Sequence, residues 1–310
     1  MKNYNIFIAT STFAVHSNEP LNILDRKGLK IIHNPLGRKL NANELVDQAS
    51  DAAGIIAGTE IYNEGVLDNL SHLKVISRLG VGMDNIDMEF GRQKNIKILK
   101  TKTTPAPAVA ELTLGLMLDV ARKISGQNQS LKSGTWKKEM GKLLHTKTLG
   151  IIGLGTIGRT LVKLVSGFNF KLLAYDLYHD ETFGEKNNIT YCDLDTLLKE
   201  SDIISIHLNL TDKTLDLINE QRLGLMKPDS ILINTSRGEI LDNDALYNAL
   251  NDETISGAGL DVYDKEPYKG PLINLENVVL TPHIGSYAKE VRIQMEIEAA
   301  QNLIKGLNSE

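Results

Sequence analysis

Three residues that suit acid–base chemistry and anion binding lie in the second half of the chain. Arg237, Glu266 and His283 each follow, by a few residues, an apolar run of the kind that forms a buried strand. The carboxyl ends of parallel strands meet at one edge of an open sheet, so residues far apart in sequence can converge there. A guanidinium binds a carboxylate, and a carboxylate beside an imidazole favours its protonated form. Together they predict a site that binds a small anion and transfers a proton.

Each of these residues also has a purely structural interpretation. His283 could cap the last helix, Arg237 could pair with Asp242 at the surface, and Glu266, which precedes a proline, could be a solvated acid in a turn. Any one of these alternatives is reasonable for one residue. All three at strand ends, beside a motif for a dinucleotide, favour chemistry.

That motif consists of Gly153, Gly155 and Gly158. It follows an apolar run at 149–152 and overlaps the start of a helical pattern at 156–167. The first glycine permits dihedral angles that other residues avoid, the second lets the backbone approach a pyrophosphate, and the third lets helix and strand pack closely. The phosphates would then bind at the helix N-terminus. This strand, turn and helix predict a dinucleotide site, with a glycine turn of some other α/β protein as the alternative.

The choice of dinucleotide depends on Asp176, which ends a second apolar run at 171–175, about 20 residues past the glycines. A carboxylate there accepts hydrogen bonds from the adenosine ribose and repels a 2'-phosphate. Leu177 and Tyr178 provide no arginine for such a phosphate. NAD is therefore expected. Reduction of a 2-keto acid by hydride needs a cation, a proton donor and a nicotinamide, which an arginine, a histidine and NADH supply.

A further glycine-punctuated turn, Arg78 to Asn85, follows an earlier apolar run at 75–77. Backbone N–H groups in such a turn can bind a carboxylate. A tight strand-to-helix connection capped by Asp84 is the alternative.

Positioning these motifs requires alternating strands and helices, and the sequence contains two such blocks. Residues 100–107 are rich in Thr, Lys, Pro and Ala and suit a linker between the blocks, and a long apolar helix is expected at 109–124. The final helix, expected at 286–307, could return to the first block. We predict two doubly wound parallel-sheet domains of the α/β class, with a Rossmann-type cofactor domain (101–286) inserted in a flavodoxin-like substrate domain (1–100 plus 287–310).

Bulk properties exclude several classes of function. The 310 residues carry a formal net charge of -5 without a Lys/Arg block, which argues against nucleic acid or an anionic membrane as partner. No apolar run is long enough to span a membrane and no secretory signal is evident, so a cytoplasmic protein is expected. Cys192 is the single cysteine, so an intrachain disulfide is excluded and a thiol without a chemical role is expected. No metal site is predicted. Trp136 is expected to anchor an interface or a core.

Several strings resemble the D-isomer-specific 2-hydroxyacid dehydrogenase family: Gly153–Gly158, Asn234–Gly238, Gly259–Pro267 and Thr281–Ser286, with Arg78–Asp87 and Ala108–Leu114 extending the likeness to nearly the whole chain. The resemblance implies that Arg237, Glu266 and His283 are catalytic and that NAD is the cofactor. It also implies backbone contacts from Val81 and Gly82 to the substrate carboxylate. Further cofactor contacts are implied for these residues: Thr156, Ile157, Asp176, Thr235, Asp261 and Gly285. Members of the family are commonly dimers joined through the cofactor domain, so a homodimer is expected.

Within the family the chain most resembles short D-3-phosphoglycerate dehydrogenases without a regulatory domain, because Arg78 matches an arginine that can face a substrate phosphate. The likeness is incomplete, since Ala57–Glu60 occupies a place where these enzymes often have another arginine, and Arg38 or Lys39 would have to replace it. D-3-phosphoglycerate is thus the first expectation for the substrate. Hydroxypyruvate or glyoxylate reduction, and an NADH-sensing binding protein of the same fold, are the alternatives.

Overall fold

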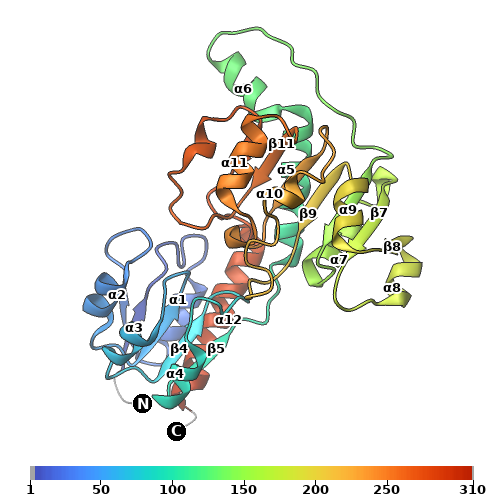
Figure 1. Ribbon diagram of the computed structural model, residues 1–310. Helices are drawn as coiled ribbons and strands as arrows, with labels where there is room; N and C mark the ends of the chain where they lie inside the picture. The colour runs from blue at the N-terminus through green and yellow to red at the C-terminus, as the bar shows by residue number, and fades with distance from the viewer. Residues whose placement is uncertain (1–3, 309–310) are drawn as a thin grey trace. The chain divides into compact units, whose positions relative to one another are not determined.

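The computed structural model describes residues 4–308, which form two compact α/β units (Figure 1). One unit contains the residues up to Pro105 together with those from Tyr287 onward, and the other spans Ala106–Ser286. Both are built on entirely parallel sheets with helices on both faces, which confirms the predicted fold class.

The first unit has a five-stranded sheet in the order β2-β1-β3-β4-β5. This is the flavodoxin-like strand order. Its elements in chain order are β1 Asn5–Ile8, α1 Glu19–Asp25, β2 Lys30–His33, α2 Ala42–Ala49, β3 Gly54–Ala57, α3 Glu64–Asp68, β4 Val75–Arg78, α4 Met88–Gln93, β5 Lys97–Lys100 and α12 Lys289–Asn308.

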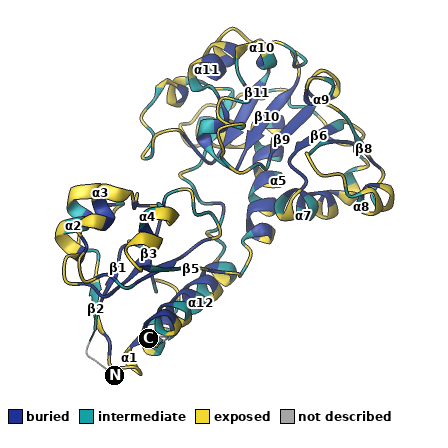
Figure 2. Cartoon of the chain, turned by 60° about the horizontal axis from the view of Figure 1, so that its bottom comes forward, coloured by how far each residue is buried: buried dark blue, intermediate teal, exposed yellow. Residues whose placement is uncertain are grey.

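The two faces of this sheet carry separate hydrophobic layers. α2 and α3 cover one face, while α1 and α12 cover the other (Figure 2). The Ser77 hydroxyl donates to the Ala299 carbonyl at 2.8 Å, and Arg292 pairs with Glu296 inside the same layer at 2.7 Å. The C-terminal helix is therefore part of the core of the first unit.

The second unit has a seven-stranded sheet in the order β12-β11-β10-β9-β6-β7-β8. Its outward progression from β6 in both directions is the Rossmann arrangement, with the switch point between β6 and β9. Its elements are α5 Ala106–Arg122, α6 Ile124–Lys132, β6 Thr148–Ile152, α7 Thr156–Leu164, β7 Lys171–Tyr175, α8 Glu181–Lys186, β8 Ile189–Tyr191, α9 Leu194–Glu200, β9 Ile203–Ile206, α10 Glu220–Leu223, β10 Ile231–Asn234, α11 Asn243–Asn251, β11 Gly257–Leu260 and β12 Val278–Leu280, with short 3-10 turns at Ser166–Phe168, Gly238–Ile240 and Pro271–Asn274.

Apolar strands explain why this sheet is buried on both sides. β6, β9 and β10 alternate between a layer covered by α5 and α7 and a layer covered by α9, α10 and α11. All four residues of β9 and of β10 are buried. Because these apolar strands are packed on both faces, their carboxyl ends are held in place. The polar residues that follow the strands therefore start from fixed positions.

The structure differs from expectation mainly at weakly patterned segments. The apolar helix α5 begins at Ala106, three residues earlier than expected, and the polar stretch after it forms α6. The helix after the glycine turn ends at Leu164 and continues as a 3-10 turn. Trp136 is 80% exposed, so in this chain it is not a core anchor.

Candidate active site

The glycine turn has the geometry of a phosphate cradle. Gly153 has φ +96°, a conformation that favours glycine, and a Cβ there would lie 2.7 Å from the His207 carbonyl oxygen. A Cβ on Gly155 would meet nothing within 4 Å, whereas one on Gly158 would collide with the Gly153 carbonyl. The middle glycine therefore leaves open space beside the first turn of α7, and the third allows helix α7 to approach the end of β6 closely. These features fit a bound pyrophosphate.

Asp176 follows β7 and lies against this turn. Its Oδ2 accepts a hydrogen bond from the Leu154 N–H at 2.7 Å, and its Oδ1 accepts one from the Tyr178 N–H at 3.0 Å. Each carboxylate oxygen has a second lone pair for a ribose hydroxyl. Thr156 and Ile157 form the first residues of α7, beside the open side of Gly155.

His283 and Glu266 are in direct contact. The His283 Nδ1 atom lies 2.9 Å from both carboxylate oxygens of Glu266. Within residues 4–308, the other ring nitrogen of His283, Nε2, makes no hydrogen bond. A carboxylate on Nδ1 fixes the proton there, so Nε2 is the atom that can exchange a proton with a ligand.

The loop that carries His283 is held by the buried carboxylate of Asp261. Asp261 Oδ1 accepts from the Thr281 hydroxyl at 2.6 Å and from the Ile284 N–H at 2.8 Å, and Oδ2 accepts from the Gly285 N–H at 2.8 Å. His283 itself has φ +54°, which is uncommon for a residue with a side chain. Burial raises the pKa of Asp261, and these hydrogen bonds oppose that rise. The loop is therefore fixed on both sides of the histidine.

Arg237 lies beyond β10 in the same unit. Asn234 binds both ends of its loop: its Nδ2 donates to the Arg237 carbonyl at 2.7 Å, and its Oδ1 accepts from the Ser236 N–H at 3.0 Å. The Arg237 Nη1 donates to the Ser236 carbonyl at 2.7 Å. Arg237, Glu266 and His283 thus all follow strands at the carboxyl edge of the seven-stranded sheet, as their positions in the sequence predicted.

Thr235 and Gly285, both predicted to contact the cofactor, are tied to the protein itself. Thr235 is 7% exposed, and its hydroxyl lies 2.9 Å from the hydroxyl of Thr113 on α5. The Gly285 N–H is used by Asp261. Because the Thr113 hydroxyl donates to the Val109 carbonyl, the Thr235 hydroxyl donates to Thr113 and keeps its lone pairs as acceptors.

The turn after β4 belongs to the first unit. The Leu79 N–H donates to the Ala57 carbonyl at 2.9 Å, and the Gly80 N–H donates to the Arg78 carbonyl at 3.1 Å. Across the described part of the chain, the N–H groups of Val81 and Gly82 have no hydrogen-bond acceptor. They are therefore available to an anion, and their contact with a substrate carboxylate stays a prediction.

Comparison with known proteins identifies the family. The family model described as "D-isomer specific 2-hydroxyacid dehydrogenase, NAD binding domain" matches residues 114–285. The chain belongs to the D-isomer-specific 2-hydroxyacid dehydrogenase family. It is an NAD(H)-dependent oxidoreductase that acts on 2-hydroxy acids.

Three relatives of this dehydrogenase carry names that differ in substrate. The chain is 38% identical to a hydroxypyruvate reductase of Thermotoga maritima, over 95% of this chain and 98% of that protein. It is 43% identical to a glyoxylate reductase of Thermococcus litoralis, over 79% and 77%. It is 38% identical to a D-3-phosphoglycerate dehydrogenase of Methanocaldococcus jannaschii, over 87% of this chain but 53% of that protein. The crystal structure of the TT0316 protein from Thermus thermophilus superposes with a TM-score of 0.89 at 33% identity, over 99% of this chain and 97% of that chain.

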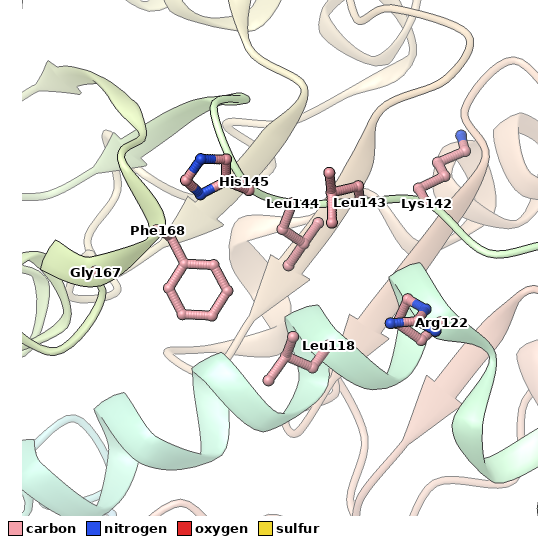
Figure 3. A pocket seen from close by; sticks show the side chains of 8 residues that line it. All are labelled: Leu118, Arg122, Lys142, Leu143, Leu144, His145, Gly167 and Phe168. Atoms are coloured by element: carbon pink, nitrogen blue, oxygen red, sulfur yellow. The ribbon is translucent and has the colours of Figure 1, made fainter.

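The dehydrogenase also has a pocket of about 300 Å³ away from the residues above. Its floor is apolar, with Leu118, Leu144 and Phe168 pointing toward one another, while the Lys142 side chain extends away from them (Figure 3). The segments that line it precede β6 and β7, so the pocket lies at the amino edge of the sheet. This edge is opposite the glycine turn, and the pocket is not the cofactor site.

Sequence reasoning did not single out His207, which follows β9 at the switch point. Its Nε2 lies 2.9 Å from the Ser205 hydroxyl, and its Nδ1 is buried without a hydrogen-bond partner among the described residues. Burial lowers the pKa of His207 to about 4. The sequence feature that could have identified His207 is its position directly after an apolar strand, beside the Gly153 turn.

Proposed function

We propose that this dehydrogenase transfers hydride between NAD(H) and a small D-2-hydroxy acid, with hydroxypyruvate and glyoxylate as the preferred 2-keto acids. The observation that carries the chemistry is the contact of His283 Nδ1 with both carboxylate oxygens of Glu266 at 2.9 Å. It leaves Nε2 as the proton-exchanging atom in a site whose third member is a cation.

Each of the three residues has a separate role in the proposal. NADH supplies the hydride when it is bound. His283 Nε2 donates a proton to the carbonyl oxygen of the keto acid, and the same atom accepts it when the hydroxy acid is oxidised. Glu266 holds the imidazole in the required tautomer and stabilises its protonated form. Arg237 binds the substrate carboxylate and stabilises the negative charge that develops on the carbonyl oxygen.

Cofactor contacts are proposed for the residues around the glycine turn. Gly155 leaves room for the pyrophosphate beside the N-terminus of α7, and Asp176 faces the same turn. In the first unit, we propose that the N–H groups of Val81 and Gly82 bind the substrate carboxylate.

The preference for unphosphorylated substrates rests on two observations. The relative that matches over nearly the full length of both chains is named for hydroxypyruvate, and the one with the highest identity among those described above is named for glyoxylate. In addition, Arg78, the residue expected to face a phosphate, is only 8% exposed. D-3-phosphoglycerate remains the second candidate, because the relative named for it is 38% identical over 87% of this chain.

A homodimer formed through the second unit is part of the proposal. Residues 124–143 of this unit include several large apolar side chains exposed to solvent: Ile124 (53%), Leu131 (55%), Trp136 (80%), Met140 (91%) and Leu143 (70%). Exposed apolar groups gathered on one segment are typical of protein interfaces. None of the described helices is long and apolar enough to cross a membrane, and a cytoplasmic location stays a prediction.

The test of the function is a parallel assay of NADH oxidation, followed by the absorbance of the reduced nicotinamide. Hydroxypyruvate, glyoxylate, 3-phosphohydroxypyruvate and pyruvate are compared by kcat/KM with the full chain. We expect the first two to be at least tenfold better than the phosphorylated compound. A preference for 3-phosphohydroxypyruvate would replace the first candidate with the second, and NADH binding without turnover of any keto acid would refute the enzymatic proposal.

A further inference from the structure

Arg78 ends β4 with its side chain almost completely buried, which is unusual for a charged residue. Its Nη1 donates a hydrogen bond to the carbonyl oxygen of the next residue, Leu79. The side chain is therefore folded back against the turn that it introduces.

Gly80 shows how closely the guanidinium packs against this turn. Its φ is +152°, and a Cβ built on it would lie 2.6 Å from Nη1, 2.9 Å from Cζ and 3.1 Å from Nη2 of Arg78. A side chain at Gly80 would take the space of the guanidinium. The arginine and the glycine thus depend on each other, and the guanidinium supports the peptide that leads into Val81 and Gly82.

The support acts directly on the groups proposed to bind substrate. The guanidinium engages the Leu79 carbonyl, which precedes the free N–H groups of Val81 and Gly82 by two and three residues. Holding this carbonyl fixes the Leu79–Gly80 peptide, from which the two peptides that carry these N–H groups continue, and the positive charge packed against Gly80 strengthens the attraction of this turn for an anion.

The neighbouring loop, after β3, contains an acid where a phosphate site would need a cation. Glu60 is 2% exposed, and its Oε2 accepts a hydrogen bond from the Gly58 N–H at 2.8 Å. Asn85 joins this loop to the turn after β4, because its Nδ2 donates to the Gly58 carbonyl at 3.2 Å and to the Glu60 carbonyl at 2.6 Å. Glu60 and Arg78 both act on the buried hydroxyl of Tyr62: the charge of Glu60 raises the pKa of Tyr62, and the charge of Arg78 lowers it. The Glu60 carboxylate repels a phosphate, which carries up to two negative charges, more strongly than it repels the single charge of a keto acid's carboxylate.

We propose that Arg78 is a positioning residue that orients the Val81 and Gly82 N–H groups toward the carboxylate common to all 2-keto acids, and that it does not bind a substrate phosphate. The inference rests on the proposed function, in which these N–H groups receive the substrate carboxylate. It assigns substrate selection by this turn to small unphosphorylated 2-keto acids.

Hydroxypyruvate and 3-phosphohydroxypyruvate test this role because they differ only in the phosphate. Wild-type protein, Arg78→Met and Arg78→Lys are assayed with both, and Arg92→Met, an exposed arginine on α4, is the control. We expect Arg78→Met to lower kcat/KM for both substrates by the same factor, at least tenfold and mainly through KM, with Arg78→Lys restoring part of it. The control is expected to match wild type. A loss confined to the phosphorylated substrate, or no loss with either, would overturn the proposal.

Three further measurements separate failure of this inference from failure of the proposed function. NADH affinity and thermal unfolding show whether Arg78→Met is folded, and Arg78→Lys provides the second variant if it is not. Calorimetry with oxamate, a carboxylate that resembles a 2-keto acid, and separately with inorganic phosphate reads binding without turnover. Weaker oxamate binding by the variants with unchanged phosphate binding supports the positioning role even if no keto acid is reduced. Weaker phosphate binding with unchanged oxamate binding refutes it.

Discussion

The Nδ1 atom of His283 is equidistant from the two carboxylate oxygens of Glu266, at 2.9 Å from each. The imidazole is 37% exposed and the carboxylate 21% exposed, so the pair retains access to solvent and to a ligand. One partner of the pair can therefore be removed without leaving a deeply buried charge.

Glu266→Gln tests whether the carboxylate acts through the histidine. Glutamine keeps the size of the side chain but loses the charge that stabilises the imidazolium. We expect Glu266→Gln to lower kcat with the preferred keto acid about 10- to 100-fold with a small change in KM. We expect His283→Ala to lower kcat about 100-fold or more. The double variant should be no worse than His283→Ala alone, because both changes remove one function. Additive losses in a steady-state double-mutant cycle would show that the two residues act independently.

Arg237 is expected to bind the substrate in both the ground state and the transition state. Arg237→Ala should therefore raise KM and lower kcat together. Arg237→Lys keeps the charge but loses the planar fork that binds a carboxylate with two hydrogen bonds, so it should recover only part of the activity. The NADH dissociation constant, measured by fluorescence, serves as the control and should change little. Full recovery by lysine would show that charge alone is sufficient.

How far the sequence predicted the molecule can be judged from particular elements. The apolar runs at 75–77 and 149–152 predicted the buried strands β4 and β6, and the glycine spacing predicted the turn after β6. The edge strand β5, Lys97–Lys100, was not expected. It has lysines at both ends and only two apolar residues, both partly exposed, so its sequence lacks the apolar run of a buried strand. Residue types also predicted Arg237, Glu266 and His283 as candidates. They did not reveal that the Arg78 side chain folds under its own turn, because that depends on side-chain direction and on the space left by Gly80.

The three hydrogen bonds accepted by Asp261 make it a further target for substitution. Asparagine has the same shape, but its NH₂ group cannot accept from the Thr281 hydroxyl or from the backbone N–H groups, so at least one donor of the loop loses its partner. Asp261→Asn should lower kcat at least tenfold by releasing the loop that carries His283, while substrate KM changes less. Hydrogen exchange of peptides covering 281–286 should become faster. Unchanged exchange together with lost activity would place Asp261 in the chemistry rather than in loop positioning.

Gly155 and Gly158 should separate cofactor binding from folding. A methyl group on Gly155 meets no protein atom within 4 Å, and its φ of -73° suits alanine, so Gly155→Ala should fold normally. The same methyl would occupy the space proposed for the pyrophosphate, so the NADH dissociation constant should rise about tenfold or more. Gly158→Ala places its methyl against the Gly153 carbonyl and should lower the melting temperature. If Gly155→Ala binds NADH normally, the proposed position of the pyrophosphate is incorrect.

The buried imidazole of His207 predicts a pH dependence of stability. Its pKa is about 4 in the folded protein because of burial, against about 6.5 in an unfolded chain, so the unfolded state binds more protons between these values. The stabilisation is complete above pH 6.5 and is lost as the pH falls toward 4, by about 2 kcal/mol between pH 7.5 and 5. His207→Gln should remove most of this loss, whereas His145→Gln, an exposed histidine of the same unit, should keep it. Urea unfolding followed by hydrogen exchange of β9 peptides at the two pH values measures the difference for this unit. Equal pH dependence in wild type and His207→Gln would show that the imidazole becomes protonated without cost.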